Sequence, residues 1–106
     1  MSELDTIDSA IEAIRAGRMI IVVDDDDREN EGDLIMAAAT ATPEQVAFMV
    51  RHTSGILCTP LTAADAARLR LQPMVSVNDA PLHTAFTVSV DYRYGLTTGI
   101  SAEERA

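Results

Sequence analysis

Apolar positions near the start of the chain recur with the spacing of a helix. They fall at i, i+3, i+4 and i+7 and comprise Ile7, Ala10, Ile11 and Ile14. This spacing places them on one helical face. Asp5 or Thr6 can cap the helix, and Gly17 is expected to end it. The apolar run 19–23 that follows is short and rich in β-branched residues, which predicts a buried strand.

Further along, three segments continue the alternation of strands and helices. The apolar run 34–38 predicts a second strand. Thr42-Pro43-Glu44-Gln45 is a capping box with Pro at the first helical position, so a helix is expected to begin there. Its buried stripe would comprise Val46, Met49 and Val50. Residues 56–59 predict a third strand, ended by Pro60.

The last third of the chain contains weaker signals. A cap at Thr62 predicts a short helix that reaches about Leu71, and 72–83 is typical of a loop. Apolar and polar residues alternate over 84–90, which predicts a strand. A capping box at 101–104 predicts the start of a helix, but the chain stops two residues later. A helix this short gains little stability, because the unfavourable first turn is not followed by further turns. We therefore expect an α/β (α+β) fold in which residues 1–106 are the front part of a longer domain.

Composition limits the classes of protein to consider. With 106 residues and 47% hydrophobic content, the chain can build one core. The single cysteine, Cys58, excludes an internal disulfide and fits a reducing compartment. No apolar run approaches the roughly 20 residues that span a bilayer. The acidic N-terminus does not resemble a targeting signal, so we expect a cytoplasmic protein with no membrane partner.

The negative charge is concentrated in one segment. Seven carboxylates fall within 24–33, accompanied by Arg28 alone, and only −3 of the net charge of −9 remains for the other 96 residues. Like charges this dense repel one another unless a cation lies among them. Nucleic acid is not an expected partner, because the chain has no cluster of arginines. It also has no lysine, which excludes a Schiff-base mechanism within this chain.

The acidic segment has three readings. Acidic runs are most often solvated loops. If the backbone stays extended, however, Glu29, Glu31 and Asp33 would share one side and could bind a hard cation such as Mg²⁺ or Mn²⁺. A calcium loop of the EF-hand type fits poorly, because Ala38 occupies the position that requires a bidentate Glu.

The motifs of this chain resemble those of the 3,4-dihydroxy-2-butanone 4-phosphate synthase family of riboflavin biosynthesis. The most specific is Asp26-Asp27-Arg28-Glu29-Asn30-Glu31-Gly32-Asp33. The other matching segments, in chain order, are 42–44, 49–51, 53–58, 71–74, 84–91 and 97–102. The resemblance runs from the first helix to the last residue. It implies a three-layer arrangement around a mixed β-sheet, which would be incomplete in 106 residues.

The resemblance also implies an activity. The family consists of lyases that convert D-ribulose 5-phosphate to L-3,4-dihydroxy-2-butanone 4-phosphate and formate, use Mg²⁺ and form homodimers. A divalent cation can stabilise the enediolate that forms when a proton next to a ketone is removed. By position, Glu29 would be a metal ligand, and Arg28 and Asp33 would hold the substrate. Glu31 is the candidate for proton transfer.

Other residues have both a structural and a functional reading. Cys58 is either a small buried hydrophobe or, as in the family, a group near the substrate. Thr97 and Thr98 form either an ordinary turn or part of the substrate site. His52 and His83 are not favoured as metal ligands, and His83 stands where the family usually has Gly, which can be needed for a positive φ.

The 106 residues lack the family's second half, including its histidine motifs. We therefore expect the intact gene product to be the synthase and this chain alone to have little or no activity. The alternative is a non-catalytic module that uses the acidic loop to bind a metal or a partner.

Overall fold

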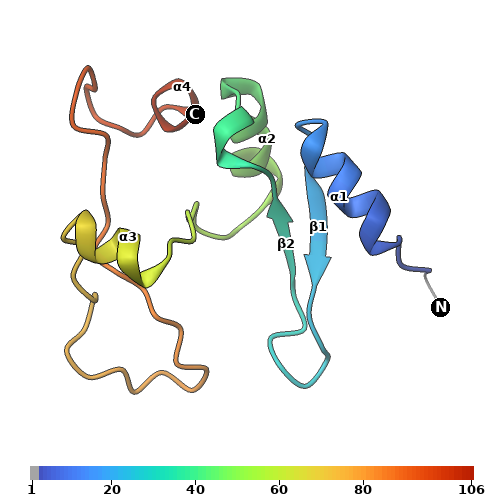
Figure 1. Cartoon of the computed structure of the whole chain (residues 1–106), viewed down its shortest axis with the longest axis horizontal. Coiled ribbons are helices and arrows are strands. Elements are labelled where there is room, and N and C mark those ends of the chain that lie inside the picture. Colours follow the sequence, from blue (N-terminus) through green and yellow to red (C-terminus); the bar gives the residue numbers. More distant parts are fainter. Residues whose placement is uncertain (1–2) are drawn as a thin grey trace. The chain divides into compact units, whose positions relative to one another are not determined.

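The computed structural model describes residues 3–106, which form two compact units. Unit 1 comprises the described residues up to Leu57 together with Ile100–Ala106, and unit 2 comprises Cys58–Gly99. Figure 1 shows the order of the helices and strands along the chain. Within the described part, no helix is both long and apolar enough to cross a membrane. The mixture of helices and strands confirms the expected α/β class.

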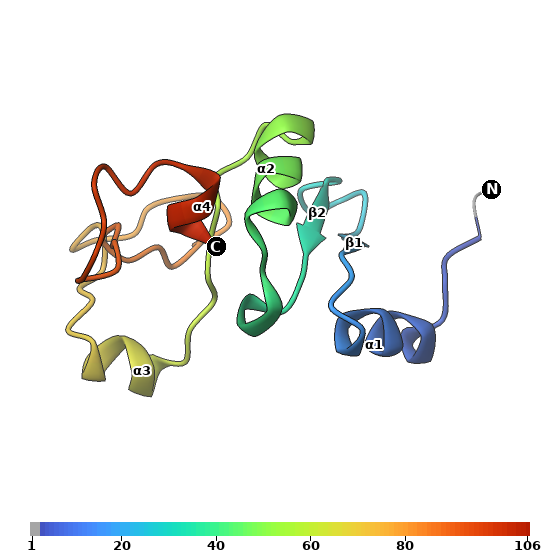
Figure 2. The same cartoon turned by 90° about the horizontal axis from the view of Figure 1, so that it is seen from above.

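Unit 1 begins with the predicted helix. Helix α1 (Ile7–Arg15) is capped by Thr6, whose Oγ1 accepts a hydrogen bond from the backbone N–H of Ser9 at 3.2 Å. The helix ends just before Gly17, which has a φ of +73° and can adopt this left-handed conformation without a Cβ penalty. Helix α1 lies beside strand β1 (Ile20–Val23), as Figures 1 and 2 show. Between them is an open apolar groove of about 350 Å³.

Strand β1 pairs with β2 (Gly32–Ile35) in a two-stranded antiparallel sheet. The register joins Ile20 to Ile35 and Val23 to Gly32. The predicted second strand, 34–38, was therefore placed too late. Strand β1 starts at Ile20, so residues after Ile35 have no opposite partner, and Ala38–Thr40 instead forms the short 3₁₀ helix η1.

The expected burial of strand 19–23 is wrong for the described residues. Ile21 is 69% exposed, and among the described residues the only buried hydrophobic one is Val46, at 3% exposure. A two-stranded hairpin with one neighbouring helix cannot cover both of its faces, so its apolar side chains remain open.

Helix α2 (Pro43–His52) has the predicted capping box. Thr42 Oγ1 accepts from the N–H of Gln45, and Gln45 Oε1 accepts from the N–H of Thr42, both at 3.2 Å. The predicted helix at the chain end is also present, as α4 (Ala102–Arg105), in which Ser101 Oγ accepts from the N–H of Glu104. Helix α4 packs against α2 within unit 1.

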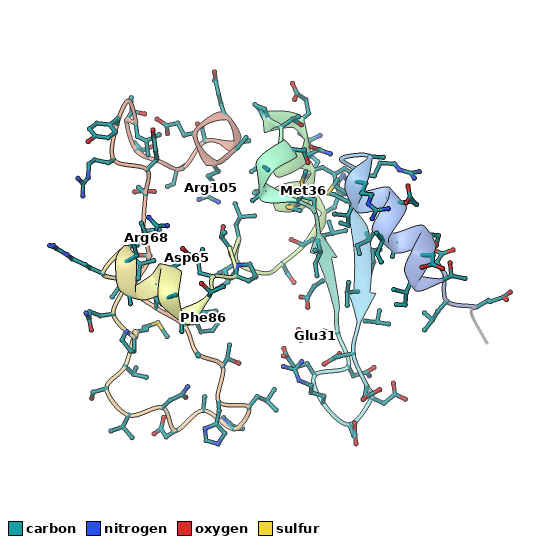
Figure 3. All side chains as sticks on the ribbon, in the orientation of Figure 1. Glu31, Met36, Asp65, Arg68, Phe86 and Arg105 are labelled. Carbon is teal, nitrogen blue, oxygen red and sulfur yellow. The ribbon has the colours of Figure 1, made fainter. Side chains whose placement is uncertain are left out.

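Unit 2 contains helix α3 (Ala63–Arg68), capped by Thr62, whose Oγ1 accepts from the N–H of Asp65 at 3.1 Å. The helix stops before the predicted Leu71, because Arg70 adopts a φ of +58°. Figure 3 shows Asp65 and Arg68 on this helix, where their side chains form an ion pair at 3.2 Å.

The strands predicted at 56–59 and 84–90 are wrong. Neither segment forms a strand in the described structure, and the only trace of pairing is an isolated antiparallel bridge between Pro73 and Thr87. Two hydrogen bonds support it, from Met74 N–H to the carbonyl of Phe86 and from Val88 N–H to the carbonyl of Gln72, each 2.9 Å. Pro73 has no N–H to donate, which limits how far this pairing can extend.

Candidate functional site

The acidic segment forms the connection between β1 and β2. At its base the hairpin is closed by a hydrogen bond of 3.4 Å from the N–H of Asp24 to the carbonyl of Glu31. At its tip, the N–H of Arg28 donates to the carbonyl of Asp25 at 3.0 Å, which forms a turn. Asn30 then adopts a φ of +52°, a conformation that Asn tolerates better than most residues. The chain therefore bends twice between Asp25 and Glu31.

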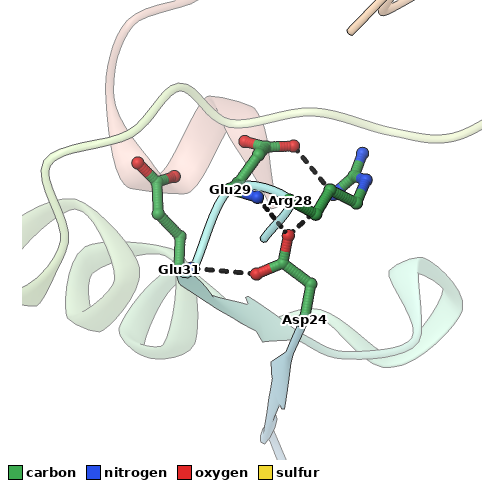
Figure 4. A network of polar contacts seen from close by, with 4 residues as sticks. All are labelled: Asp24, Arg28, Glu29 and Glu31. Atoms are coloured by element: carbon green, nitrogen blue, oxygen red, sulfur yellow. Dashed lines mark hydrogen bonds and ion pairs between the residues drawn. The ribbon is translucent and has the colours of Figure 1, made fainter. Parts of the chain in front are cut away.

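The carboxylate of Asp24 lies at the centre of this turn (Figure 4). Its Oδ2 accepts from the backbone N–H of Glu29 and from Nη1 of Arg28, each at 2.9 Å. Its Oδ1 accepts from the backbone N–H of Glu31, also at 2.9 Å. Arg28 Nη1 additionally lies 2.9 Å from Oε1 of Glu29. Three of the predicted site residues, Arg28, Glu29 and Glu31, are thus brought together.

These contacts change the electrostatics of two groups. Hydrogen bonds from the backbone N–H groups of Glu31 and Glu29, with the nearby Arg28 guanidinium, lower the pKa of Asp24 below its ordinary value. The hydrogen bond to Asp24 and the charge of Glu29 raise the pKa of Arg28. One cation therefore compensates two carboxylates, and the turn is folded with Asp24 ionised.

The expectation that Glu29, Glu31 and Asp33 converge on one side is wrong. It required an extended backbone, but the left-handed Asn30 separates Glu29 from Glu31, and Asp33 lies within β2 opposite Val22. In the part of the chain that the structure describes, no group of three acidic, His or Cys side chains could hold a metal ion.

A single carboxylate is nevertheless compatible with magnesium. Mg²⁺ is usually bound through one or two carboxylates, with waters and substrate oxygens completing its coordination sphere. The Glu29 side chain is 37% exposed and carries an accessible carboxylate, so it can supply one ligand. The Arg28 side chain is 54% exposed and can reach an anionic ligand.

The remaining predicted site residues belong to unit 2. Cys58 is exposed, so the interpretation of Cys58 as a small buried hydrophobic residue is wrong. Thr97 and Thr98 precede Gly99, which has a φ of +71°. A Cβ at Gly99 would come within 2.5 Å of Asp91 Oδ1, so the Asp91 carboxylate lies directly against this turn.

The two histidines have different surroundings. His52 ends helix α2, where its ring lies 4.4 Å from that of Phe48. His83 has a φ of +53°, a left-handed conformation that favours Gly and is uncommon for a residue with a Cβ.

The sequence motifs do not distinguish Asp24 from the other acids of the run. The signal that identifies it is its position directly after β1, because Asp side chains commonly accept hydrogen bonds from backbone N–H groups in the turn that follows them.

Comparison with known proteins identifies the family. The family model for 3,4-dihydroxy-2-butanone 4-phosphate synthase matches residues 8–106. The riboflavin biosynthesis protein RibBA of Nocardia farcinica is 59% identical over all 106 residues, and that of Mycobacterium tuberculosis is 58% identical. The chain spans 26% and 25% of their lengths, about a quarter in each case.

Solved structures agree with the sequence relatives. A 3,4-dihydroxy-2-butanone 4-phosphate synthase in complex with two magnesium ions has a TM-score of 0.92 and 50% identity, covering 96% of this chain and 48% of its own. A cation-free form of such a synthase has a TM-score of 0.85 and 47% identity, covering 97% and 47%. By sequence and by fold, the chain belongs to the 3,4-dihydroxy-2-butanone 4-phosphate synthase family.

Proposed function

We propose that the protein carrying this sequence converts D-ribulose 5-phosphate to L-3,4-dihydroxy-2-butanone 4-phosphate and formate, in riboflavin biosynthesis. The proposal rests on the turn in which the Asp24 carboxylate accepts hydrogen bonds from Arg28, Glu29 and Glu31. This turn lies in a sequence that matches the synthase family over 99 residues, 8–106. The atoms of the substrate account for both products, so the reaction needs no further reactant.

Each charged residue of the site has a chemical role in this proposal. Arg28 holds the substrate through charge-assisted hydrogen bonds, for which its exposed guanidinium is suited. Asp33 accepts hydrogen bonds from substrate hydroxyl groups. Glu31 takes the proton from the carbon next to the ketone.

Glu29 supplies a ligand to Mg²⁺ or Mn²⁺ and helps to hold the substrate. When bound, the ion supplies positive charge where negative charge develops next to the ketone. By resemblance to the family, Cys58 would lie near the reacting carbons, and Thr97 and Thr98 would contact the substrate. The protein acts in the cytoplasm.

We propose further that residues 1–106 are the N-terminal portion of a single synthase domain with three layers around a mixed sheet. Three observations support this. The matched synthase chains are about twice as long as the matched region. The groove between α1 and β1 is lined almost entirely by isoleucine and alanine and is open. Among described residues, only Val46 is a buried hydrophobic residue. Apolar surface of this extent is normally covered by further protein.

The test is an assay of formate release from D-ribulose 5-phosphate with Mg²⁺. The intact protein should release formate, and the 106-residue chain should release little or none, because it contributes only part of the site. Glu31→Gln in the intact protein should abolish most of the activity. Asp26→Asn removes one charge from the same turn without changing a proposed site residue, and should leave activity near that of the wild type.

Two results would contradict the proposal. Failure of the intact protein to release formate would exclude the activity, and full activity of the 106-residue chain would exclude the incomplete domain. Titration calorimetry separates the alternative function: Mg²⁺ binding by the intact protein without binding of the sugar phosphate would favour a non-catalytic metal-binding module. We also expect the intact protein to be a homodimer, which light scattering after size-exclusion chromatography measures.

A further inference from the structure

One side chain makes the hydrogen bonds that hold the acidic turn in its shape. Asp24 binds groups four, five and seven residues further along the chain, which are Arg28 Nη1, the N–H of Glu29 and the N–H of Glu31. Its own side chain is only 22% exposed, compared with 54% for Arg28. The four residues are drawn together in Figure 4. For Asp25, Asp26 and Asp27, no side-chain hydrogen bond is found within the described part of the chain.

The position of Asp24 makes this arrangement stiff. Its backbone directly follows β1, and its N–H donates to the carbonyl of Glu31 while its Oδ1 accepts from the N–H of the same residue. Glu31 is therefore held at both its N–H and its C=O. Glu29 is held at its N–H by Oδ2, and Asn30 between them is left in the strained positive-φ region.

We infer that Asp24 is a positioning residue for the synthase reaction: its carboxylate sets the places of Glu29, Glu31 and Arg28 while it does not itself contact the substrate. This inference rests on the proposed function. Both of its oxygens are occupied by donors of this chain, so Asp24 has little capacity left for a ligand. The side chains of Glu29 and Arg28 are more exposed and carry the contacts to the metal and the substrate.

Replacement of Asp24 by Asn tests the inference, because it keeps the size of the side chain and changes its hydrogen bonding. An Asn side chain offers one acceptor oxygen, and its NH₂ group would face an N–H or a guanidinium. At least one of the three contacts must then be lost. Asp26→Asn is the matched control: it makes the same change of charge and size in the same turn.

In the intact protein, we expect Asp24→Asn to lower kcat/KM about 100-fold, the effect of a misplacement of about 1 Å at a catalytic group. The half-saturating concentration of Mg²⁺ should rise, because Glu29 is no longer held. Asp26→Asn should change both quantities by no more than about twofold, as is usual for a surface substitution. If Asp24→Asn only destabilised the protein, less of it would be folded and the maximum activity would fall. The half-saturating concentration of Mg²⁺ would not change.

A structural readout separates this inference from the proposed function. Amide hydrogen exchange of the intact protein should become faster at Glu29 and Glu31 in Asp24→Asn but not in Asp26→Asn, while exchange in β1 stays unchanged. If the wild type released no formate, the proposed function would fail, and the exchange measurement would still decide whether Asp24 holds the turn.

If Asp24→Asn does not fold, Asp24→Glu takes its place, since it keeps the charge and both acceptors but moves them by one methylene group. It should fold and lose activity to a similar extent. Wild-type activity in either Asp24 variant, equal losses in Asp24→Asn and Asp26→Asn, or unchanged exchange at Glu29 and Glu31 would overturn the inference.

Discussion

The side-chain amide of Gln45 joins two helices of unit 1: its Nε2 donates to the backbone carbonyl of Gly17 at 2.7 Å, across 28 residues of sequence. The same side chain also accepts from the N–H of Thr42 through Oε1. One residue therefore completes the cap of α2 and ties it to the turn that ends α1. The Gly17 carbonyl is available there because a φ of +73° turns the backbone away from the helix axis.

We expect Gln45→Ala to lower the free energy of unfolding of the intact protein by about 1–2 kcal/mol, since it removes part of a cap and a partly buried hydrogen bond. Urea denaturation measures this. Gln45→Glu is the matched control, because a carboxylate can still accept from Thr42 N–H but cannot donate to Gly17. If Gln45→Glu were as stable as the wild type, the bond to Gly17 would contribute nothing.

The contact between Asp91 and Gly99 predicts a second effect. A Cβ at Gly99 would lie 2.5 Å from Asp91 Oδ1, and the φ of +71° is itself unfavourable for a residue with a side chain. Gly99→Ala should therefore destabilise the intact protein by about 2 kcal/mol, and by only about 1 kcal/mol in an Asp91→Ala background, where the contact with the carboxylate is absent. Equal costs in the two backgrounds would show that Asp91 does not restrict the turn.

The features that sequence reasoning predicted correctly are local. The predicted caps at Thr42, Thr62 and Ser101 are present, and of the two candidates for the first helix, Asp5 and Thr6, the cap is Thr6. A cap can be predicted from sequence because it joins groups only three residues apart. The strands at 56–59 and 84–90 were wrong, because a strand exists only when a partner lies beside it. Within the described residues, the only bridge that involves either segment is the isolated one between Thr87 and Pro73.

At the candidate site, the position of the charged turn along the chain could be predicted, but its geometry could not. The density of charge in 24–33 singles out a segment in which the structure brings Arg28, Glu29 and Glu31 around Asp24. The expected geometry was wrong, because alternation along an extended chain places Glu29 and Glu31 on one side, whereas a positive φ at Asn30 changes the direction of the backbone between them. A backbone conformation at one residue is set by the contacts around it, here the hydrogen bonds to Asp24, and is not visible in the order of residue types.

His83 leads to a third prediction. It has a φ of +53° in a loop that Asn78 organises, with Asn78 Oδ1 accepting from Ala80 N–H and Nδ2 donating to the carbonyl of Thr84. His83→Gly should raise the free energy of unfolding by about 0.5–1 kcal/mol, the relief of left-handed strain less the larger entropy loss of Gly on folding. His83→Ala keeps a Cβ and should give no gain. Equal stability of the Gly and Ala variants would show that this conformation carries no strain.

Ionisation of Asp65 predicts a dependence on pH. Its Oδ2 accepts from the hydroxyl of Thr62 at 3.0 Å, and this bond, followed by the hydrogen bonds from Arg68, lowers the pKa of Asp65 below its ordinary value of 3.8. Because the folded state binds the proton less tightly than the unfolded state, the contribution of Asp65 to stability is fully present above pH 3.8. It is lost as the pH falls through the lower pKa of the folded state.

Carbon-detected NMR titration of the Asp65 carboxyl group in the intact protein measures this pKa directly. Thr62→Ala should raise the pKa more than Arg68→Ala, because the Thr62 hydroxyl is the larger cause of the shift. Thr62→Ser keeps the hydroxyl and should restore the low value, which distinguishes loss of the hydrogen bond from general disorder of α3. A pKa at the ordinary value in the wild type would mean that the bond between Thr62 and Asp65 is not maintained in solution, and the cap of α3 would then depend on Thr62 Oγ1 accepting from Asp65 N–H alone.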